Sequence, residues 1–346
     1  MTTKRQIKWL IAHVPQYLFI RTAKYFSQEL EKLLPGQFEI EVLTIPQYIK
    51  KYNDIDGLNF TSPVIPGLEE KVPSDIDPRF KKAIDFADID RKWSSFFMAL
   101  EDGRIALSQT QVTVIGNLVD TDFLALDLPF LFKNHDHATR VLDGEIGEGI
   151  LNRLSEKSFL KALAFTYSGG YRVIGAKSEI KSLLDLQSKT MLPHTPPSNQ
   201  LFSDLGVQTI NKLYSTPQDL ADLSANEGTV ETTYLRFTGK YVLKTHHSMF
   251  LTSILTGGGF WSTLTGEQQA AFKQAAKKCA IVERQMSIKD TEIYEYYAEA
   301  NGIKINQISQ EELNQMKQIS KKTYARLEGT FSSNLVSNII AAETPD

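Results

Sequence analysis

Hydrophobic and polar positions along the N-terminal part of the chain switch between strand and helix spacing. The apolar run Lys8–His13 predicts a buried strand, and Pro15–Leu34 carries apolar residues three and four positions apart, as a helix does. Phe38–Leu43 alternates apolar and polar residues, which indicates a second strand. Strand, helix and strand joined by short links form a βαβ unit. The pattern therefore predicts a parallel sheet and the α/β class.

Short apolar runs and amphipathic segments continue to alternate up to the C-terminus. Further strands are predicted at 104–117 (one or two), 160–167, 207–213, 228–234 and within 242–254. Further helices are predicted at 91–102, 135–154, 198–205, 217–225, 265–300 and 310–327. The helix at 265–300 is long enough that we expect it to support both domains. Ser309 is the expected N-cap of the last helix, with Glu312 completing a capping box.

Residues 52–88 interrupt this regular pattern. The segment is charged and contains Pro63, Pro66, Pro73 and Pro78. Prolines at this density disfavour both helices and central strands, so we predict a surface insertion here.

Length, charge and hydropathy limit the classes of protein to consider. At 346 residues the chain exceeds what one hydrophobic core usually serves, so two domains are expected. The net charge is −3 and the Lys and Arg residues are dispersed, which argues against a nucleic-acid partner. No segment approaches the ~20 consecutive apolar residues of a membrane span. We therefore expect neither nucleic-acid binding nor direct membrane insertion.

The sequence offers little for catalysis or metal binding. Cys279 is the only cysteine, which excludes an intrachain disulfide and a metal site built from several cysteines. His246 and His247 are adjacent, and neighbours on a strand point to opposite faces. No P-loop, GxSxG or HExxH motif is present. We expect no enzymatic activity, no metal and no cofactor.

The stretch Ala164–Pro193 holds the first candidate for ligand binding. A Gly-Gly pair precedes Tyr171 and Arg172, and two glycines allow a sharp turn or a close backbone approach. An arginine placed just after such a crossing can hold a small anion through two parallel hydrogen bonds. Arg172 and Tyr171 are therefore candidate contacts.

Other candidates follow from their places in the predicted elements. His13, Gln16 and Tyr17 lie at the carboxyl end of the first strand, where ligands of open α/β sheets collect. Alternate residues of one strand share a face, which groups Gln109 with Gln111 and, on the strand predicted at 228–234, Thr232 with Tyr234.

Four segments in order resemble the DctP-like solute-binding proteins of TRAP transporters. They are LALDLPFLFKNHDHATRVLDGEIGEGILNRL, AFTYSGGYRVIGAKSEIKSLLDL, DLGVQTINKLYSTPQDLADL followed by EGTVETT, and FWSTLTGEQQAAFKQAAKKCAIVER. Their order and spacing agree with that family from about Ile7 to about Leu327.

The resemblance implies a two-lobed fold of the periplasmic-binding-protein type. Each lobe would be a mixed sheet flanked by helices, and one long helix would brace both lobes. The first lobe would comprise residues 1–168 and about 255–300, with the insertion at 52–88. The second lobe would comprise residues 169–254 and about 301–346. Such proteins close on a small ligand between the lobes.

The resemblance also assigns residues to the ligand. The family's first ligand-side arginine falls on Arg172, whereas its main carboxylate-binding arginine falls on Leu192 in DLQSKTMLP. In one interpretation the ligand is still an acid, held by Arg172 with Arg236 or His194 substituting. In the other, which we favour slightly, the ligand is neutral or more apolar and meets Leu192 and aromatic residues that include Phe260 and Trp261. A local slip of the alignment would instead bring in Lys189 or His194.

The resemblance further implies a location and a partner. A signal peptide is not apparent in MTTKRQIKWLIAHV, which leaves either a cytoplasmic protein or one whose signal peptide was removed. The resemblance implies the second, a periplasmic protein. The expected partners are the small ligand and, transiently, the membrane subunits of a TRAP transporter. Two alternatives remain, namely a binding protein that feeds a sensor or receptor and an enzyme that borrowed the fold.

Overall fold

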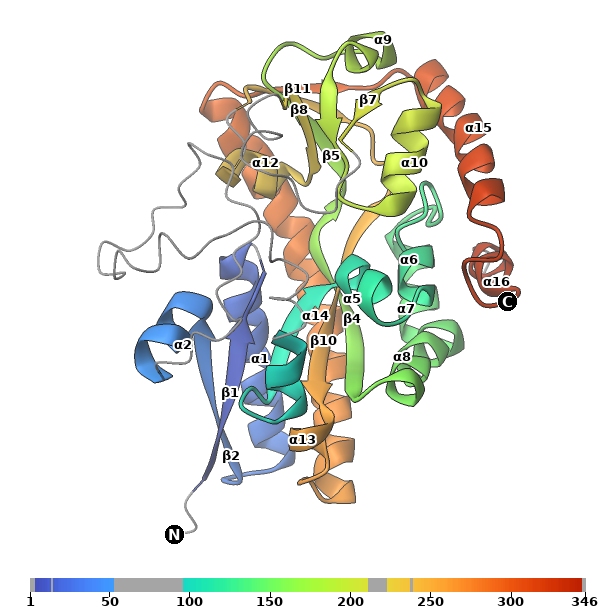
Figure 1. Ribbon diagram of the computed structural model, residues 1–346. Helices are drawn as coiled ribbons and strands as arrows, with labels where there is room; N and C mark the ends of the chain where they lie inside the picture. The colour runs from blue at the N-terminus through green and yellow to red at the C-terminus, as the bar shows by residue number, and fades with distance from the viewer. Residues whose placement is uncertain (1–3, 14, 53–95, 211–222, 237–238, 344–346) are drawn as a thin grey trace.

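The computed structural model describes residues 4–13, 15–52, 96–210, 223–236 and 239–343. These residues form two β-sheets flanked by helices, one above the other in Figure 1. We call the five-stranded sheet with its helices the first lobe and the six-stranded sheet with its helices the second lobe. Both sheets combine parallel and antiparallel pairs, which confirms the predicted α/β class with a mixed sheet in each lobe.

The first lobe is built on the βαβ unit predicted at the N-terminus. β1 (Arg5–Ile11) pairs in parallel with β2 (Phe38–Thr44), and α1 (Gln16–Leu33) connects them. The strand order is β2-β1-β3-β10-β4, where the remaining strands are β3 (Leu107–Gln111), β10 (Met249–Gly257) and β4 (Leu160–Tyr171). β10 is antiparallel to both of its neighbours. It brings the chain back from the second lobe into this sheet.

Helices cover both faces of the first sheet. On one face Ile7 and Trp9 of β1 pack with α1 and with α14 (Gly266–Ala300), and on the other Leu10 packs into a separate cluster. Neighbouring residues of β1 lie in different clusters because successive side chains of a strand point to opposite faces of the sheet. Further helices of the lobe, among the described residues, are α2 (Ile45–Tyr52), α5 (Val112–Leu118), α6 (Asp122–Ala125), α7 (His135–Asp143), α8 (Glu145–Lys157), α13 (Gly258–Trp261) and α16 (Leu335–Ala341), and residues 96–101 are also helical.

The second lobe has the strand order β11-β9-β5-β8-β6-β7. Its strands are β5 (Val173–Ala176), β6 (Thr190–Leu192), β7 (Gln208–Thr209), β8 (Ala225–Gly228), β9 (Tyr241–Lys244) and β11 (Lys304–Gln307). Its helices within the described residues are α9 (Leu183–Gln187), α10 (Pro196–Asp204), α12 (Val230–Arg236) and α15 (Gln310–Arg326). Ser309 caps α15 by accepting a hydrogen bond from the Glu312 backbone, which confirms the predicted cap.

Several segments connect the lobes. β4 leads into β5 through the single residue Arg172, and β9 leads back to β10 through residues 245–248. α14 packs on β4 and α1 in the first lobe and on α12 and β11 in the second, which confirms the predicted bracing helix (Figure 1). Within the described ranges, none of the helices combines the length and hydropathy that crossing a membrane requires.

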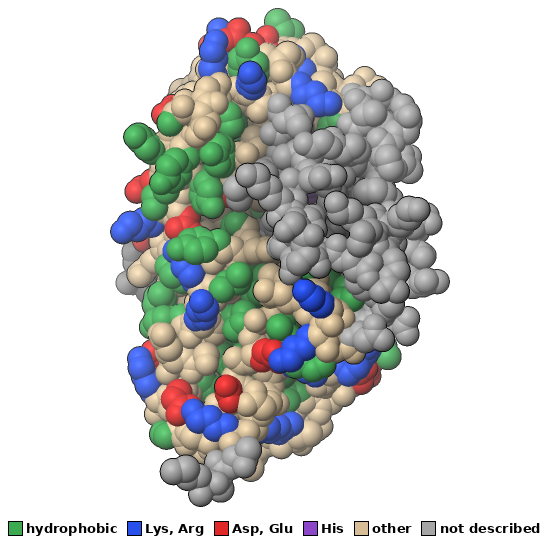
Figure 2. Space-filling view, turned by 90° about the vertical axis from the view of Figure 1, so that its left-hand side faces the viewer, with side chains coloured by type: hydrophobic (Ala, Val, Ile, Leu, Met, Phe, Trp, Pro, Cys, Tyr) green, Lys and Arg blue, Asp and Glu red, His purple; other side chains and the backbone are tan. Residues whose placement is uncertain are grey.

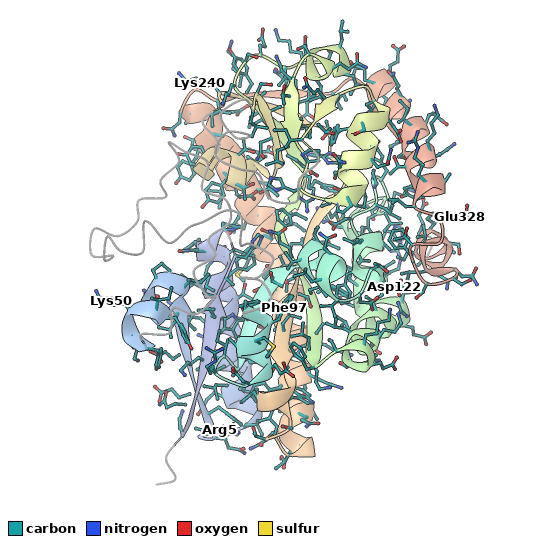
Figure 3. The ribbon with its side chains drawn as sticks, in the orientation of Figure 1. Arg5, Lys50, Phe97, Asp122, Lys240 and Glu328 are labelled. Carbon is teal, nitrogen blue, oxygen red and sulfur yellow. The ribbon has the colours of Figure 1, made fainter. Side chains whose placement is uncertain are left out.

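The C-terminal segment also returns from one lobe to the other. α15 packs on α10 of the second lobe, whereas α16 packs on α6 and α8 of the first. Figure 3 shows Asp122, on α6, and Glu328, after α15, on the same edge of the molecule. Ser332 joins this segment to the first lobe by donating backbone and side-chain hydrogen bonds to Asp122 at 2.7 and 2.5 Å. Residues 335–341 thus pack with the first lobe, although we expected 301–346 in the second.

The prediction of a strand at 228–234 is wrong. β8 ends at Gly228, and α12 follows from Val230. Thr229 and Thr232 cap this helix reciprocally, because each hydroxyl accepts a hydrogen bond from the other residue's backbone N–H, at 2.8 and 3.3 Å. Such local caps favour a helix start over the strand propensity of threonine.

Three other boundaries differ from the predictions. The helix predicted at 135–154 is divided at Gly144 into α7 and α8, and the strand region predicted at 104–117 ends at Gln111, where α5 begins. β10 enters the first sheet at Met249, earlier than the crossing expected near Leu255, because the whole strand is buried between β3 and β4. Most of the predicted insertion at 52–88 and of the helix at 217–225 lies outside the described residues.

Candidate functional site

Two crossing segments join the lobes, namely the β4–β5 and β9–β10 connections, and Arg172 lies where they meet. It is the one residue between β4 and β5, and its backbone N–H donates to the carbonyl of Ser248, which precedes β10, at 2.8 Å. Its side chain is completely buried. The Gly-Gly pair before it has positive φ at both residues, 88° at Gly169 and 68° at Gly170, a conformation that glycine adopts without strain. The glycines therefore set the direction in which the chain delivers Arg172.

The guanidinium of Arg172 lies among one aromatic ring and two carboxylates. It stacks over Phe250 of β10 at 4.0 Å from the ring centroid. Nη2 is 3.6 Å from Oδ1 of Asp127, and Nε is 3.6 Å from Oε1 of Glu227. These distances are too long for hydrogen bonds. Among the described residues none of the three guanidinium nitrogens has a hydrogen-bond partner. Buried donors are almost always satisfied, so their environment is suited to a bound acceptor or water.

The two carboxylates come from different lobes. Asp127 follows α6 in the first lobe and accepts a hydrogen bond from the Thr113 hydroxyl at 2.6 Å. Burial raises the pKa of Asp127 to about 6, although the nearby Arg172 acts in the opposite direction. Asp127 Oδ1 has no hydrogen-bond partner within the described residues. The first lobe thus contributes a carboxyl group that can exchange a proton near neutral pH.

Glu227 is the more strongly bonded carboxylate and lies on β8 of the second lobe. It accepts hydrogen bonds from the Ser198 hydroxyl at 2.8 Å and the His194 backbone at 2.5 Å, and its Oε1 is 2.9 Å from Nε2 of His247. Burial acts to raise the pKa of Glu227, but Arg172, His247 and His194 together lower it below its ordinary value. Glu227 is therefore ionised, and it offsets the charge of Arg172.

Three other predicted residues share this neighbourhood. The His13 ring lies 5.3 Å from the ring of Phe250, and Gln111 Nε2 is 3.3 Å from His13 Nδ1. His194 contacts Glu227 through its backbone and Asn226 through its ring at 3.1 Å. The structure thus groups His13, Gln111 and His194 around the Arg172 site.

Leu192 lies on the strand next to that of Glu227. It is buried at the end of β6 and pairs with Asn226 of β8. The Leu192 side chain is therefore apolar and enclosed in the second lobe. Lys189, the alternative if the alignment slips, donates instead to the Ser178 hydroxyl on the outer side of the second lobe.

Gln109 and Tyr171 lie near site residues but contact other groups. Gln109 is buried and donates to the Thr166 hydroxyl at 2.6 Å, with Glu283 of α14 at 3.4 Å. It shares a face of β3 with Gln111, but its side chain bonds to β4 and α14 and not to the His13 ring. Tyr171 points away from the Arg172 guanidinium and stacks on His246 at 5.0 Å.

The remaining predicted residues lie in the hydrophobic core or at the surface. Phe260 and Trp261 are buried with Phe272 in the core below the first sheet. Thr232 caps α12, and the Tyr234 hydroxyl accepts a hydrogen bond from Asn301.

Tyr17 and Gln16 lie at the start of α1. The Tyr17 side chain is 63% exposed, and the Arg21 guanidinium lies over its ring. Gln16 is half-buried. The Arg236 side chain lies outside the described residues.

Sequence reasoning missed Asp127, Glu227, Phe250 and His247 as members of the site. A signal existed for Asp127, because it is the one charged residue within the apolar run LALDLPFLF. A carboxylate inside such a run is costly unless it is paired. For Glu227 and Phe250 no comparable signal exists, since their roles arise from pairings between distant strands.

Comparison with known proteins gives a consistent assignment. The sequence model of the family described as "Bacterial extracellular solute-binding protein, family 7" (DctP) matches residues 94–215 and 228–330. The 2,3-diketo-L-gulonate-binding periplasmic protein YiaO of Escherichia coli is 25% identical over 172 residues, 48% of this chain and 52% of that protein. The chain spans about half the length of the curated relatives it matches first.

Solved structures show the same fold over almost the whole chain. A TRAP periplasmic solute-binding protein from Haemophilus influenzae with bound L-gulonate has a TM-score of 0.74 at 18% identity, covering 98% of this chain and 100% of that one. One from Shewanella oneidensis with bound succinate has a TM-score of 0.73 at 15% identity, covering 99% and 100%. At these identities the likeness establishes the fold alone.

Proposed function

Because the chain belongs to the DctP family of bacterial extracellular solute-binding proteins, we propose that it closes on a small organic ligand between its lobes and delivers it to a TRAP-type transporter. The proposal places the protein in the periplasm and makes its contact with the membrane subunits transient. Proteins of this family bind solutes and are not enzymes, in agreement with the prediction from the sequence.

One observation carries the proposal, namely the buried guanidinium of Arg172 between the lobes, which has no hydrogen-bond partner in the described part of the chain. Its five N–H groups can hold a carboxylate, a carbonyl or a hydroxyl oxygen. Asp127 of the first lobe and Glu227 of the second both lie at 3.6 Å from it. A ligand bound there contacts groups from both lobes, so it stabilises the arrangement in which they approach each other.

The charge around Arg172 supports a ligand that is neutral, or at most weakly anionic at its bound end. Two carboxyl groups already face this one guanidinium. The resemblance places the buried, apolar Leu192 at the position of the family's main carboxylate-binding arginine. A further full negative charge would enter a buried site whose positive charge is already offset, at a large desolvation cost. A hydroxyl or carbonyl group next to an apolar portion suits Arg172 and Leu192 better.

Native mass spectrometry, before and after mild denaturation, tests the proposal by identifying any ligand that copurifies. A thermal-shift screen of mono- and dicarboxylates against neutral metabolites extends it, because a bound ligand raises the melting temperature by mass action. We expect neutral or hydroxylated compounds to stabilise the protein more than dicarboxylates. Strong stabilisation by dicarboxylates at millimolar concentration would contradict the preference for a neutral ligand.

Variants at Arg172 test the site itself. Arg172→Gln removes the charge and the paired donors, so we expect the ligand's Kd to rise at least tenfold, whereas Arg172→Lys should retain part of the affinity. Arg326→Gln is the matched control, since Arg326 pairs with Asp204 at the outer surface of the second lobe. Unchanged affinity of every ligand for Arg172→Gln would show that the site lies elsewhere.

A further inference from the structure

The two crossing segments direct consecutive side chains to opposite sides. Arg172 faces Glu227 and Phe250, whereas Tyr171 before it faces the other way. On the second crossing His247 faces Glu227, whereas His246 stacks on Tyr171. On each segment, two consecutive residues thus line two different sites. One is the Arg172 site. The other lies on the opposite side of the two connections (β4–β5 and β9–β10), which we call the hinge.

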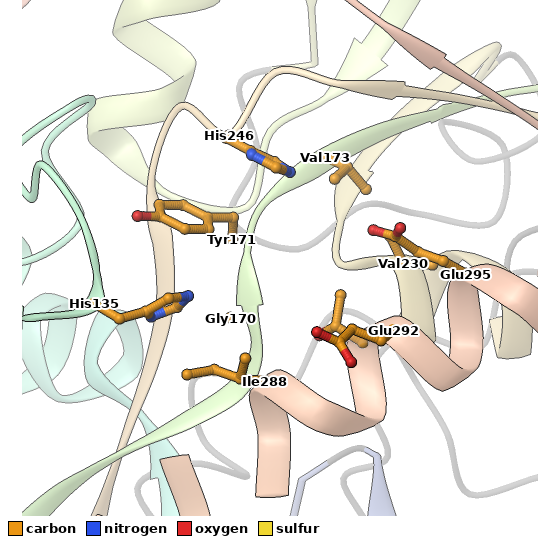
Figure 4. Close-up of a pocket in the computed structure, with 10 residues that line it drawn as sticks. His135, Gly170, Tyr171, Val173, Val230, His246, Ile288, Glu292 and Glu295 are labelled. Atoms are coloured by element: carbon orange, nitrogen blue, oxygen red, sulfur yellow. The ribbon is translucent and has the colours of Figure 1, made fainter. Parts of the chain in front are cut away.

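The far side of the hinge contains a cavity of about 130 Å³. That is several times the ~10–15 Å³ that one water requires. Its walls come from both crossings, from α12 and from the C-terminal half of α14. Figure 4 shows His246, Tyr171 and His135 along one side and Glu292 and Glu295 of α14 opposite. The cavity therefore adjoins every element that connects the lobes here.

Aromatic and aliphatic groups form most of the cavity wall. The rings of Tyr171 and His246 are stacked at 5.0 Å with an interplanar angle of 19°, and the His135 ring lies 5.0 Å from that of Tyr171. Val173, Val230 and Ile288 complete the apolar part. A wall of this kind accommodates hydrocarbon and, at the aromatic rings, a positive charge.

The charged groups of the wall are negative. Glu295 pairs with Lys244 of β9 at 2.7 Å, whereas the side chain of Glu292 makes no ion pair or hydrogen bond within the described residues. Burial lowers the pKa of His135, and burial with the nearby Lys244 lowers that of His246 to about 4. Both imidazoles are thus neutral at neutral pH. One carboxylate is left without a counter-charge beside an apolar surface.

The backbone at His246 is held in an uncommon conformation. Its φ is +47°, in the left-handed region that residues other than glycine seldom adopt. Strain of this kind persists where the surrounding structure fixes it, often at functional positions. Here it turns the His246 ring onto Tyr171 while His247 keeps its contact with Glu227. The wall of the cavity is therefore built at a cost to the backbone.

We propose that this cavity is a second binding site, separate from the Arg172 site, which takes a small alkylammonium cation. The ammonium group lies at Glu292 and the alkyl part against Tyr171, Val173 and Ile288. A metal ion does not suit the wall, because the described residues contain no group of three His, Cys, Asp or Glu side chains placed to share one. The site does not depend on the proposed transport function.

Titration with n-propylammonium chloride, followed by ligand-observed NMR at constant ionic strength, tests this site. 1-Propanol is the matched neutral probe, because it replaces the ammonium by a hydroxyl on the same alkyl chain. We expect n-propylammonium to bind with a Kd in the millimolar range and 1-propanol at least fivefold more weakly. Absence of saturable binding, or equal binding of both probes, would overturn the proposal.

Three variants locate the binding. Glu292→Gln, an exposed position where folding is not at risk, should weaken n-propylammonium at least threefold. Glu299→Gln, exposed two turns further along α14 and outside the cavity, is the matched control and should have no effect. Arg172→Gln should leave n-propylammonium binding unchanged. If Glu292→Gln has no effect, or Arg172→Gln abolishes binding, the cavity is not the site, and the proposed function of the Arg172 site is unaffected.

Discussion

At the scale of single residues, the electrostatics of the site depend on how far Asp127 and Glu227 each offset the positive charge of Arg172. Asp127 and Glu227 stand at the same distance, but their surroundings differ. Glu227 has three polar contacts that favour its ionised form, whereas Asp127 has one side-chain hydrogen bond and a pKa raised by burial to about 6. Glu227 therefore carries most of the compensation for Arg172.

Neutralising Glu227 should shift ligand preference toward acids. In Glu227→Gln the amide cannot offset the charge of Arg172, so the site gains net positive potential. We expect the ratio of lactate to lactamide affinity, measured by calorimetry at pH 7.5, to rise about tenfold. Glu179→Gln, at an exposed pair with Lys181, is the control. An unchanged ratio would mean that Glu227 does not set the charge of the site.

At the scale of elements, the hinge glycines are not equivalent. A Cβ added at Gly169 would lie 2.7 Å from the Thr229 hydroxyl and against the buried Glu231 carboxylate, whereas at Gly170 its nearest neighbour is His135 at 3.8 Å. Gly170→Ala should therefore cost only backbone strain, about 1–2 kcal/mol. Gly169→Ala adds steric overlap, and we expect roughly 2–5 kcal/mol in total from urea unfolding. Equal losses for the two variants would argue against close packing of α12 on the hinge.

The bracing helix contains a buried acid that makes stability depend on pH. Glu283 of α14 accepts a hydrogen bond from the Tyr167 backbone at 2.8 Å, and burial raises its pKa to about 8. Since the unfolded chain loses this proton near pH 4.5, the folded state binds more protons between about pH 4.5 and 8. The free energy of unfolding therefore falls as pH rises through that window, with a contribution approaching about 1.4 kcal/mol per pH unit.

Glu283→Gln should remove that contribution. Glutamine keeps an acceptor for the Tyr167 N–H but has no proton to lose. We expect the decline in unfolding free energy between pH 5.5 and 7.5 to be shallower than in the unmodified protein, where Asp127 and Glu231, with pKa values raised by burial to about 6 and 7, still contribute. Glu299→Gln on the same helix should leave the slope unchanged. Parallel slopes for Glu283→Gln and the unmodified protein would contradict the assignment.

Elements whose signals are local could be predicted from the sequence, and those fixed by distant contacts could not. The N-terminal βαβ unit, the long helix and the cap at Ser309 each depend on neighbouring residues, and all three are present. The strand predicted at 228–234 failed because a reciprocal threonine cap, invisible to a two-residue pattern, favours α12. Arg172 could be proposed from its glycines, but its carboxylate and aromatic neighbours come from strands far apart in the sequence.

At the scale of the whole molecule, the described connections between the lobes lie close together, with one exception. The exception is the C-terminal segment, which leads from α15 back to the first lobe. The face in Figure 2 shows Lys and Arg side chains scattered among acidic and apolar ones, so its visible, described surface has mixed charge. On the edge that Figure 3 labels at Asp122 and Glu328, the return segment links α15 of the second lobe to α16 on the first. This link joins the lobes at a point away from the hinge, and its strength depends on how firmly α16 is anchored.

Adjacent isoleucines on α16 allow that anchoring to be measured. Ile339 is fully buried in the core of the first lobe and its carbonyl lies 2.7 Å from His137 Nε2, whereas Ile340 is 45% exposed. Ile339→Ala creates a cavity, so we expect a loss of about 2–5 kcal/mol in unfolding free energy. Ile340→Ala should stay within about 0.5 kcal/mol. Limited proteolysis should then cut the segment after α15 sooner in Ile339→Ala alone, and equal cleavage of both variants would show that α16 does not hold the two lobes together.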